Sequence, residues 1–242
     1  MTKTKKVPFQ FKNELKNGKH VLTLSGSIRK KYWSDDDVIN AKDVREALES
    51  VSDDIIIKLN SLGGDVFEGI EIYNYLKAHP SNVTVEVTGV AASAATFIVA
   101  GANEVIMNVG TLLMIHEAST FAWGNKSDIQ KTLNALETID VSILSIYSEK
   151  TGQTNEQLKE WMEEEKWFNA DEAVEFGFAD LVKREQEQEP EDSEETEESI
   201  EDIVNAKVAK AMAAFSNTQN EPITETPKKS SLVARLKKGE NK

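Results

Sequence analysis

Short apolar segments typical of buried strands alternate with amphipathic helical patterns between residues 20 and 184. We expect strands at 20–24, 55–57, 83–88, 105–107 and 112–115, and helices around 44–51 and 70–76 and from about 92, 127, 154 and 169 onward. A strand followed by a helix and then another strand favours an α/β fold with parallel strand pairing and right-handed crossovers.

Polar residues mark where several of these helices begin. Capping boxes are predicted at three pairs: Ser127 with Gln130, Thr154 with Gln157, and Asn169 with Glu172. Pro80 ends the helix around 70–76, and Gly177 stands where a helix C-cap favours glycine. The sequence therefore predicts a long helix from Ser127 and two shorter helices after it.

The charge distribution changes abruptly after residue 184. Residues 185–202 contain eleven acidic and no basic side chains, within a chain whose net charge is −14. We expect a folded domain over 1–184 and a disordered acidic linker over 185–199. Apolar residues at helical spacing predict an amphipathic helix over 200–216, and 217–242 is a polar and then basic tail. The tail is either a flexible appendage or, with the helix, a docking arm for an acidic partner.

Composition excludes several classes of function. The chain contains no Cys, so disulfides, cysteine-based zinc sites and cysteine nucleophiles are excluded. Its acidic balance argues against a nucleic-acid partner, because phosphate binding needs a basic surface. The longest nearly apolar run, 90–102, has 13 residues, whereas a membrane span needs about 20. The basic N-terminus has no apolar stretch after it, so we expect a soluble cytoplasmic protein.

Ser93 lies where a buried strand is predicted to turn into a helix, within Gly89-Val90-Ala91-Ala92-Ser93-Ala94-Ala95. The small neighbours leave the hydroxyl uncovered, and the positive end of the helix dipole can stabilise a developing oxyanion. The alternative is a small serine in a tightly packed helix. The flanking alanines distinguish the segment from the G-x-S-x-G nucleophile elbow.

A serine nucleophile needs a base, and the chain has three histidines. His20 lies beside Lys19 at the start of a strand, and His79 lies at a helix C-terminus, where an imidazole complements the dipole. His116 follows an apolar strand at its carboxyl end, where the sites of α/β proteins gather. His116 is therefore the favoured base, and a locally hydrogen-bonded histidine at the edge of the core is the alternative.

Gly63 and Gly64 follow a buried strand and precede a helix, so their backbone N–H groups are accessible to a ligand. An ordinary strand–helix turn is one reading of this segment. A phosphate-binding loop is another, but the Lys-Ser/Thr of the Walker pattern is missing.

Four groups of residues, taken together, resemble the ClpP serine peptidase family. In order they are Asn60-Ser61-x-Gly63-Gly64, Gly89-x-Ala91-Ala92-Ser93-Ala94-Ala95, Met114-Ile115-His116, and Glu172-Ala173-x-Glu175-x-Gly177. The resemblance is greatest to the bacteriophage branch, the head-maturation (prohead) proteases. Residues 65–74 and the pair Trp167-Phe168 support this branch, and the likeness covers about residues 20–184.

The resemblance implies a role for each matching residue. It makes Ser93 the nucleophile and His116 the base, with the backbone N–H groups of Gly64 and Ala94 as the oxyanion hole. Glu165 stands where the family carries an aspartate, and Asp171 and Asp128 are the other candidates for the third member. The alternative is that Glu165 is only one of three surface acids, with Glu163 and Glu164. Leu62 replaces the proline usual in the glycine turn. No metal, nucleotide or organic cofactor is implied.

The resemblance also implies a fold, partners and a cellular role. We expect a ClpP/crotonase-like repeated ββα spiral that assembles into a ring-shaped homo-oligomer. The phage branch implies cleavage of capsid scaffold proteins and of the enzyme's own tail. It also implies capsid contacts through that tail, and a location in the host cytoplasm or inside the procapsid. The alternatives are a housekeeping ATP-dependent ClpP subunit, a crotonase-like acyl-CoA enzyme, and a non-catalytic capsid-assembly component.

Overall fold

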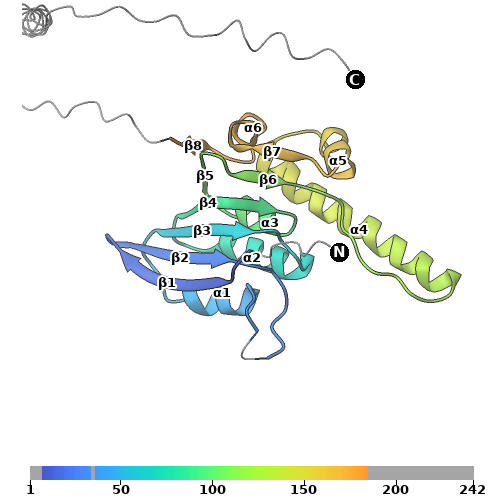
Figure 1. Ribbon diagram of the computed structural model, residues 1–242, viewed down its shortest axis with the longest axis horizontal. Helices are drawn as coiled ribbons and strands as arrows, with labels where there is room; N and C mark the ends of the chain where they lie inside the picture. The colour runs from blue at the N-terminus through green and yellow to red at the C-terminus, as the bar shows by residue number, and fades with distance from the viewer. Residues whose placement is uncertain (1–6, 34–35, 185–242) are drawn as a thin grey trace, which may run out of the picture. The chain divides into compact units, whose positions relative to one another are not determined.

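A computed structural model describes residues 7–33 and 36–184 of the chain (Figure 1). The predicted acidic linker, the amphipathic helix and the basic tail lie outside the described residues. Within the described part, no helix combines the length and the apolar character needed to cross a membrane.

The described residues form eight strands and six helices in a mixed α/β order. The strands are β1 Gln10–Lys16, β2 Lys19–Ser25, β3 Ile55–Ser61, β4 Val83–Ala92, β5 Glu104–Asn108, β6 Leu112–Met114, β7 Trp167–Asn169 and β8 Leu181–Lys183. The helices are α1 Ala41–Leu48, α2 Val66–Ala78, α3 Ala95–Ala100, α4 Lys126–Thr151, α5 Asn155–Glu163 and α6 Ala170–Glu175. This confirms the α/β class.

The sheet has the strand order β1-β2-β3-β4-β5-β8, with β6 paired to β4 and β7 paired to β6. The prediction of parallel pairing is confirmed for β2–β3, β3–β4, β4–β5, β4–β6 and β5–β8. It is wrong for two other pairs. The pairs β1–β2 and β6–β7 are antiparallel. Asn17 and Gly18 both have positive φ, which allows a two-residue hairpin between β1 and β2. β1 was not predicted because this exposed edge strand is mostly polar.

Alternate residues of the central strands point into one apolar core. The side chains of Leu22, Ile57, Leu59, Val85 and Val87 are fully buried there. Helices α1, α2 and α3 lie on this side of the sheet (Figure 1). Burial of one face in this way fixes the strand register, because a slip by one residue would turn the apolar side chains outward.

The sheet divides near the end of β4. Residues 84–87 of β4 pair with β5, whereas residues 90–92 pair with β6. Gly89 stands between the two stretches, and a Cβ there would lie 2.5 Å from Oδ1 of Asn60. The same oxygen accepts a hydrogen bond from the N–H of Val90 (3.2 Å). The division brings the carboxyl end of β4 beside the carboxyl end of β6.

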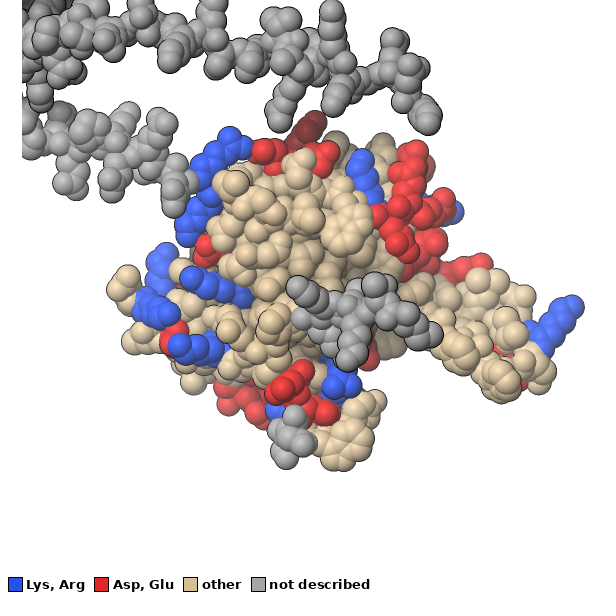
Figure 2. Space-filling view, in the orientation of Figure 1, with Lys and Arg blue, Asp and Glu red and all other residues tan. Residues whose placement is uncertain are grey.

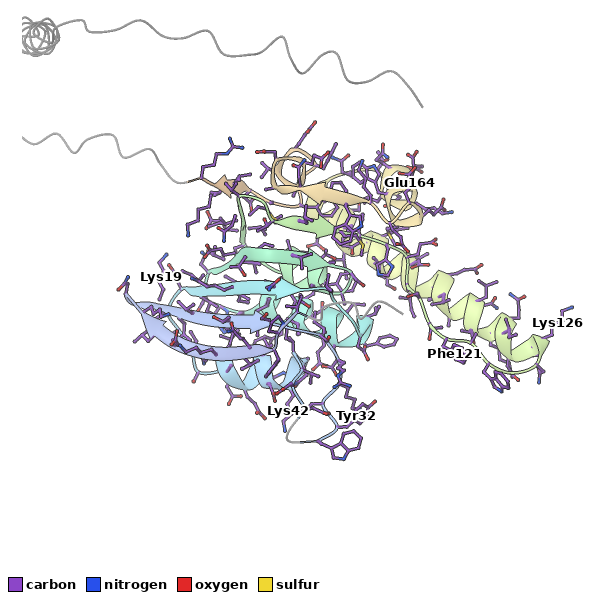
Figure 3. All side chains as sticks on the ribbon, in the orientation of Figure 1. Lys19, Tyr32, Lys42, Phe121, Lys126 and Glu164 are labelled. Carbon is purple, nitrogen blue, oxygen red and sulfur yellow. The ribbon has the colours of Figure 1, made fainter. Side chains whose placement is uncertain are left out.

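The long helix α4 starts at Lys126, one residue before its predicted start, and its N-cap lies two residues before the predicted one. Its capping box joins Asn125 to Asp128, not Ser127 to Gln130, because Asn125 has the extended backbone that an N-cap needs. The N-terminal half of α4 and the segment before it extend away from the sheet (Figure 1). Figure 3 places Lys126 at the far end of this extension and Phe121 along it; we call the extension the arm (residues 117–141).

The other two helix starts agree more closely with the sequence. The box of Asn169 and Glu172 is confirmed, and Gly177 follows α6 with φ of 84°. At α5, Thr154 accepts a hydrogen bond from the N–H of Gln157, but the Gln157 side chain donates to Glu160 instead of returning to Thr154. That predicted box is therefore only half formed.

Candidate active site

Ser93 occupies the turn between β4 and α3. The helix starts at Ala95, three residues after the predicted start near Ala92, and Ser93 lies at the junction of strand and helix, as the sequence predicts. Its φ of 55° lies in the left-handed region, which costs about 1–2 kcal/mol for a residue with a Cβ. Its N–H donates to the carbonyl of Met114 in β6 (2.9 Å). The sharp strand–turn–helix path presents the hydroxyl beyond the end of the sheet, as nucleophile elbows do without sharing their sequence.

His116 lies directly beside Ser93. Its Nε2 atom is 2.7 Å from Oγ of Ser93, although 23 residues separate them. The contact follows from the fold, because β6 is parallel to the end of β4 and both chains continue past the same sheet edge. Both side chains are half-buried, so they are held by their surroundings and can still be reached by a substrate.

The other two histidines lie elsewhere. The Nε2 atom of His79 is 3.1 Å from the carbonyl oxygen of Leu48, and its Nδ1 atom accepts the N–H of Ser81. His20 lies in β2, where it is paired with Ile55 of β3. Of the three, only His116 contacts Ser93, as the elimination argument from sequence predicts.

The glycine loop after β3 packs against the Ser93 turn. Gly63 and Gly64 both have positive φ, and an ideal Cβ on Gly63 would lie 2.8 Å from the backbone nitrogen of Ala94. Across residues 7–33 and 36–184, neither the N–H of Gly64 nor that of Ala94 has a hydrogen-bond partner. Two unpaired backbone donors on adjoining segments beside a serine hydroxyl have the composition of an oxyanion hole.

The turn that carries Glu165 is bound to both neighbours of His116. Ile115 donates to the carbonyl of Lys166 (3.2 Å), and Glu117 donates to that of Met162 (3.3 Å). The carboxylate of Glu165 is exposed, and no described side chain hydrogen-bonds to Nδ1 of His116. Glu163, Glu164 and Glu165 are all exposed. Figure 2 shows acidic side chains gathered beside the arm. The structure brings its backbone, but not its carboxylate, to the histidine.

The two other acids predicted as candidates are engaged elsewhere. Asp171 forms an ion pair with Arg184. Asp128 accepts the N–H of Asn125 as part of the cap of α4. Neither is positioned to orient His116. Among the described residues, no group of three or more His, Asp or Glu side chains could hold a metal ion.

Two residues near Ser93 were missed by the sequence analysis. The hydroxyl of Thr96 donates to the carbonyl of Ser93 (2.6 Å) and lies 2.6 Å from the hydroxyl of Tyr147 in α4. Thr96 is the only hydroxyl-bearing residue of α3, whose other side chains are apolar. The sequence did contain a signal for Thr96, since a hydroxyl in an otherwise apolar buried helix must have a hydrogen-bond partner.

A comparison with protein families agrees with this geometry. The model of the Clp protease family matches residues 28–186. Similar proteins include the ATP-dependent Clp protease proteolytic subunit 3 of Rhodococcus jostii, 32% identical over 131 residues that cover 53% of this chain and 65% of the relative. Subunit 1 of Streptomyces avermitilis is also 32% identical over 131 residues, which cover 53% of this chain and 60% of the relative.

A third relative matches over a longer stretch. The proteolytic subunit 2 of Corynebacterium glutamicum is 29% identical over 153 residues, which cover 61% of this chain and 76% of the relative. The chain thus spans slightly less than two thirds of the first two relatives and about three quarters of the third. Because the family pattern extends over most of the chain and includes the glycine loop, the Ser93 turn and His116, the chain belongs to the Clp protease family, a family of serine-type peptidases.

Proposed function

We propose that this chain is a serine endopeptidase in which Ser93 is the nucleophile and His116 is the general base. The observation that carries the proposal is the 2.7 Å separation between Nε2 of His116 and Oγ of Ser93. Proton transfer requires heavy atoms at about this distance, and a serine hydroxyl is a weak nucleophile until a base accepts its proton.

The reaction follows from the placement of these groups. Oγ of Ser93 attacks the peptide carbonyl carbon while Nε2 of His116 takes the hydroxyl proton. The carbonyl oxygen becomes an oxyanion that accepts hydrogen bonds from the N–H groups of Gly64 and Ala94. His116 then gives its proton to the leaving amine, and an acyl ester remains on Ser93. Water hydrolyses this ester with His116 again as base, which regenerates the free enzyme.

Glu165 is the third member of the proposed site. Its turn is hydrogen-bonded to the residues on both sides of His116, and Asp171 and Asp128 have other partners. A rotation of the exposed side chain toward Nδ1 would hold the imidazole in the reactive tautomer and stabilise the imidazolium. Such contacts are often long or absent without substrate and tighten when it binds.

The geometry supports peptidase chemistry over two other readings. A crotonase-like acyl-CoA enzyme gives Ser93 and His116 no joint role. A non-catalytic assembly component needs neither the left-handed backbone of Ser93 nor the unpaired donors beside it. Strained backbone of this kind clusters at active sites and ligand-binding sites.

The relatives favour one cellular role over another. Those named above are proteolytic subunits of ATP-dependent Clp proteases, which supports a subunit that receives protein substrates from an unfolding ATPase. The reading as a phage head-maturation protease, with capsid scaffold as substrate, rests on the sequence resemblance alone. It stays a prediction, as do the repeated ββα spiral, the cytoplasmic or procapsid location, and the capsid contacts of the tail.

Self-assembly into a ring is also part of the proposal. The arm carries Phe121 and Trp123, whose side chains are 86% and 87% exposed. Where the arm meets α5, a groove of about 500 Å³ is lined by Leu133 and Leu136 of the arm and by Leu144, among others. Exposed apolar surface of this kind marks an interface with another chain, and a second copy of this chain supplies the same surface.

Covalent labelling with a fluorophosphonate, measured as intact mass, tests the central claim. The wild type should gain one label, Ser93→Ala none, and His116→Ala should label at least a hundredfold more slowly. Unlabelled wild type, or labelling that persists in Ser93→Ala, would contradict it. Adding a Clp-type ATPase with ATP should then accelerate degradation of a folded protein. Shortening of the chain itself, absent in Ser93→Ala, would instead favour the maturation role.

A further inference from the structure

A buried chain of hydroxyl groups connects α4 to the carbonyl of Ser93. Oγ1 of Thr96 lies 2.6 Å from the carbonyl oxygen of Ser93 and 2.6 Å from the hydroxyl oxygen of Tyr147, which lies 51 residues further along the sequence. Thr96 and Tyr147 are each only 1% exposed. Water cannot substitute for either partner in such a place, so these bonds are part of the folded structure.

Proton counting gives the chain a direction. A threonine hydroxyl has one proton, and a carbonyl oxygen can only accept. The proton of Thr96 therefore goes to Ser93, and Tyr147 must donate its own proton to Oγ1 of Thr96. Burial raises the pKa of the Tyr147 hydroxyl well above its ordinary value, so the group keeps this proton. Hydrogen bonds in series polarise one another, which strengthens the last one.

The ring of Tyr147 is fixed by its neighbours. Its centroid lies 5.8 Å from that of Phe97 in α3 and 5.9 Å from that of Phe178, with the Phe178 ring meeting it edge to face. Aromatic contacts at these separations are favourable in tilted and edge-to-face arrangements. The position of the Tyr147 hydroxyl is therefore set by the packing of the core and does not depend on the Ser93 turn.

The planarity of the peptide bond transmits this constraint to the active site. The carbonyl of Ser93 and the N–H of Ala94 belong to one trans peptide group, so they point in opposite directions in one plane. Whatever holds the carbonyl oxygen also aims the N–H. The same oxygen also accepts the backbone N–H of Thr96 (2.9 Å), so the Thr96 hydroxyl adds a second hydrogen bond. It does so at a turn where Ser93 has a left-handed backbone that its Cβ disfavours.

We propose that Thr96 and Tyr147 are positioning residues, which hold the Ser93 carbonyl from behind and so aim the Ala94 N–H at the oxyanion. The inference rests on the proposed function, because it assigns the Ala94 N–H to the oxyanion hole. It predicts that loss of either hydroxyl leaves substrate binding intact and weakens only the stabilisation that develops in the transition state.

The test compares full-length wild type with Tyr147→Phe, Thr96→Ala, the double variant and Thr96→Ser. Inactivation by a fluorophosphonate is followed over a range of concentrations, which separates the limiting rate, kinact, from the apparent affinity, KI. Tyr73→Phe is the matched control, because the Tyr73 hydroxyl bonds to Glu149 and not to the site. The thermal midpoint Tm of each variant reports on folding.

Removing one hydrogen-bond donor from an oxyanion hole typically lowers the rate by about 10²–10³. A donor that is present but points in the wrong direction should lower the rate by less. We expect kinact to fall about tenfold in Tyr147→Phe and about ten- to a hundredfold in Thr96→Ala, with KI unchanged within twofold. The double variant should be no slower than Thr96→Ala, because both changes break one chain. Thr96→Ser should retain wild-type kinact, and Tyr73→Phe should match wild type throughout.

The outcomes separate this inference from the proposed function. If the wild type labels at Ser93 but Tyr147→Phe and Thr96→Ala keep wild-type kinact, the positioning role is wrong and the peptidase assignment stands. A fall in kinact that accompanies an equal change in KI and a lower Tm, without rescue by Thr96→Ser, would also overturn it, because that pattern indicates general damage. A wild type that does not label at all would overturn both.

Discussion

Gly63 packs so closely against Ser93 that an ideal Cβ on the glycine would lie 2.7 Å from Cβ of the serine. The same atom would lie 2.5 Å from the carbonyl oxygen of Ala92 and 2.8 Å from the nitrogen of Ala94. Both of these are backbone atoms, which cannot rotate away as a side chain can. The glycine loop and the serine turn therefore fit together only without a side chain at position 63.

Gly63→Ala should lose activity and some stability. The φ of 85° strains an alanine, and the new methyl would push the Ser93 turn away from the loop. We expect fluorophosphonate labelling to slow at least a hundredfold, and the free energy of unfolding to fall by about 1–3 kcal/mol. Gly110→Ala is the matched control, because its φ is 80° and nothing lies within 4 Å of the added Cβ. It should lose about 1–2 kcal/mol and label normally; equal labelling of the two variants would contradict the argument.

The sequence predicts the parts of this site that depend on local pattern. The serine after a buried strand, the histidine after another and the paired glycines all follow strands whose apolar residues were evident. Parallel strands end at the same edge of a sheet, so the meeting of Ser93 with His116 could be expected from their positions. The choice of His116 among three histidines needed only their placement at strand or helix ends.

Other features depend on contacts that a local pattern does not contain. The bond from Tyr147 to Thr96 joins α4 to α3, and its formation is determined by how the two helices pack. The antiparallel strand β1 is polar and at the sheet edge, so it has no apolar alternation to reveal it. The position of the Glu165 carboxylate depends on the rotation of an exposed side chain, which neither spacing nor resemblance determines.

Glu165→Gln should slow peptide hydrolysis and leave the fold intact, since the side chain is exposed. An amide cannot stabilise the imidazolium of His116. We expect a loss of about 10- to 1,000-fold in kcat, below the roughly 10⁴ found when a buried triad aspartate becomes an amide, because water screens an exposed charge. Asp171→Asn and Asp128→Asn should leave kcat within twofold. If kcat is unchanged in Glu165→Gln but falls in Asp171→Asn or Asp128→Asn, the acid replaced in that variant is the third catalytic residue instead.

Replacing the aromatic residues of the arm should dissociate the assembly. Phe121→Ser with Trp123→Ser removes two large apolar side chains that are almost fully exposed in the single chain. We expect sedimentation velocity to show a shift from a ring to smaller species. Tyr32→Ser with Trp33→Ser is the matched control, because this pair is also exposed, each side chain at 69%. Figure 3 places Tyr32 away from Phe121. If both double variants dissociate to the same extent, or if neither dissociates, the arm is not the interface.

The ion pair between Glu86 and Lys183 connects the last strand to the centre of the sheet. The Nζ atom of Lys183 in β8 lies 3.0 Å from Oε1 of Glu86 in β4, across the intervening β5. Burial opposes ionisation of Glu86, but hydrogen bonds from Lys183 and Asn108 and the charges of Lys183 and Lys58 outweigh it, so the pKa of Glu86 is lowered. A carboxyl with a lowered pKa in the folded state binds its proton less readily than in the unfolded chain.

This difference determines how stability depends on pH. The contribution of Glu86 is fully present above the pKa of an unfolded glutamate, about 4.3, and is lost as the pH falls through the lower folded pKa. At pH 7 both Glu86→Gln and Lys183→Met should unfold at lower urea concentration than wild type, because each removes one partner of the pair. As the pH is lowered from 7 to about 3, the wild-type midpoint should fall towards those of the variants, since wild type then loses the same interaction by protonation. Midpoint differences that stay constant over this range would show that the Glu86 charge does not contribute to folding, and would leave only the packing of its side chain as the source of any difference at pH 7.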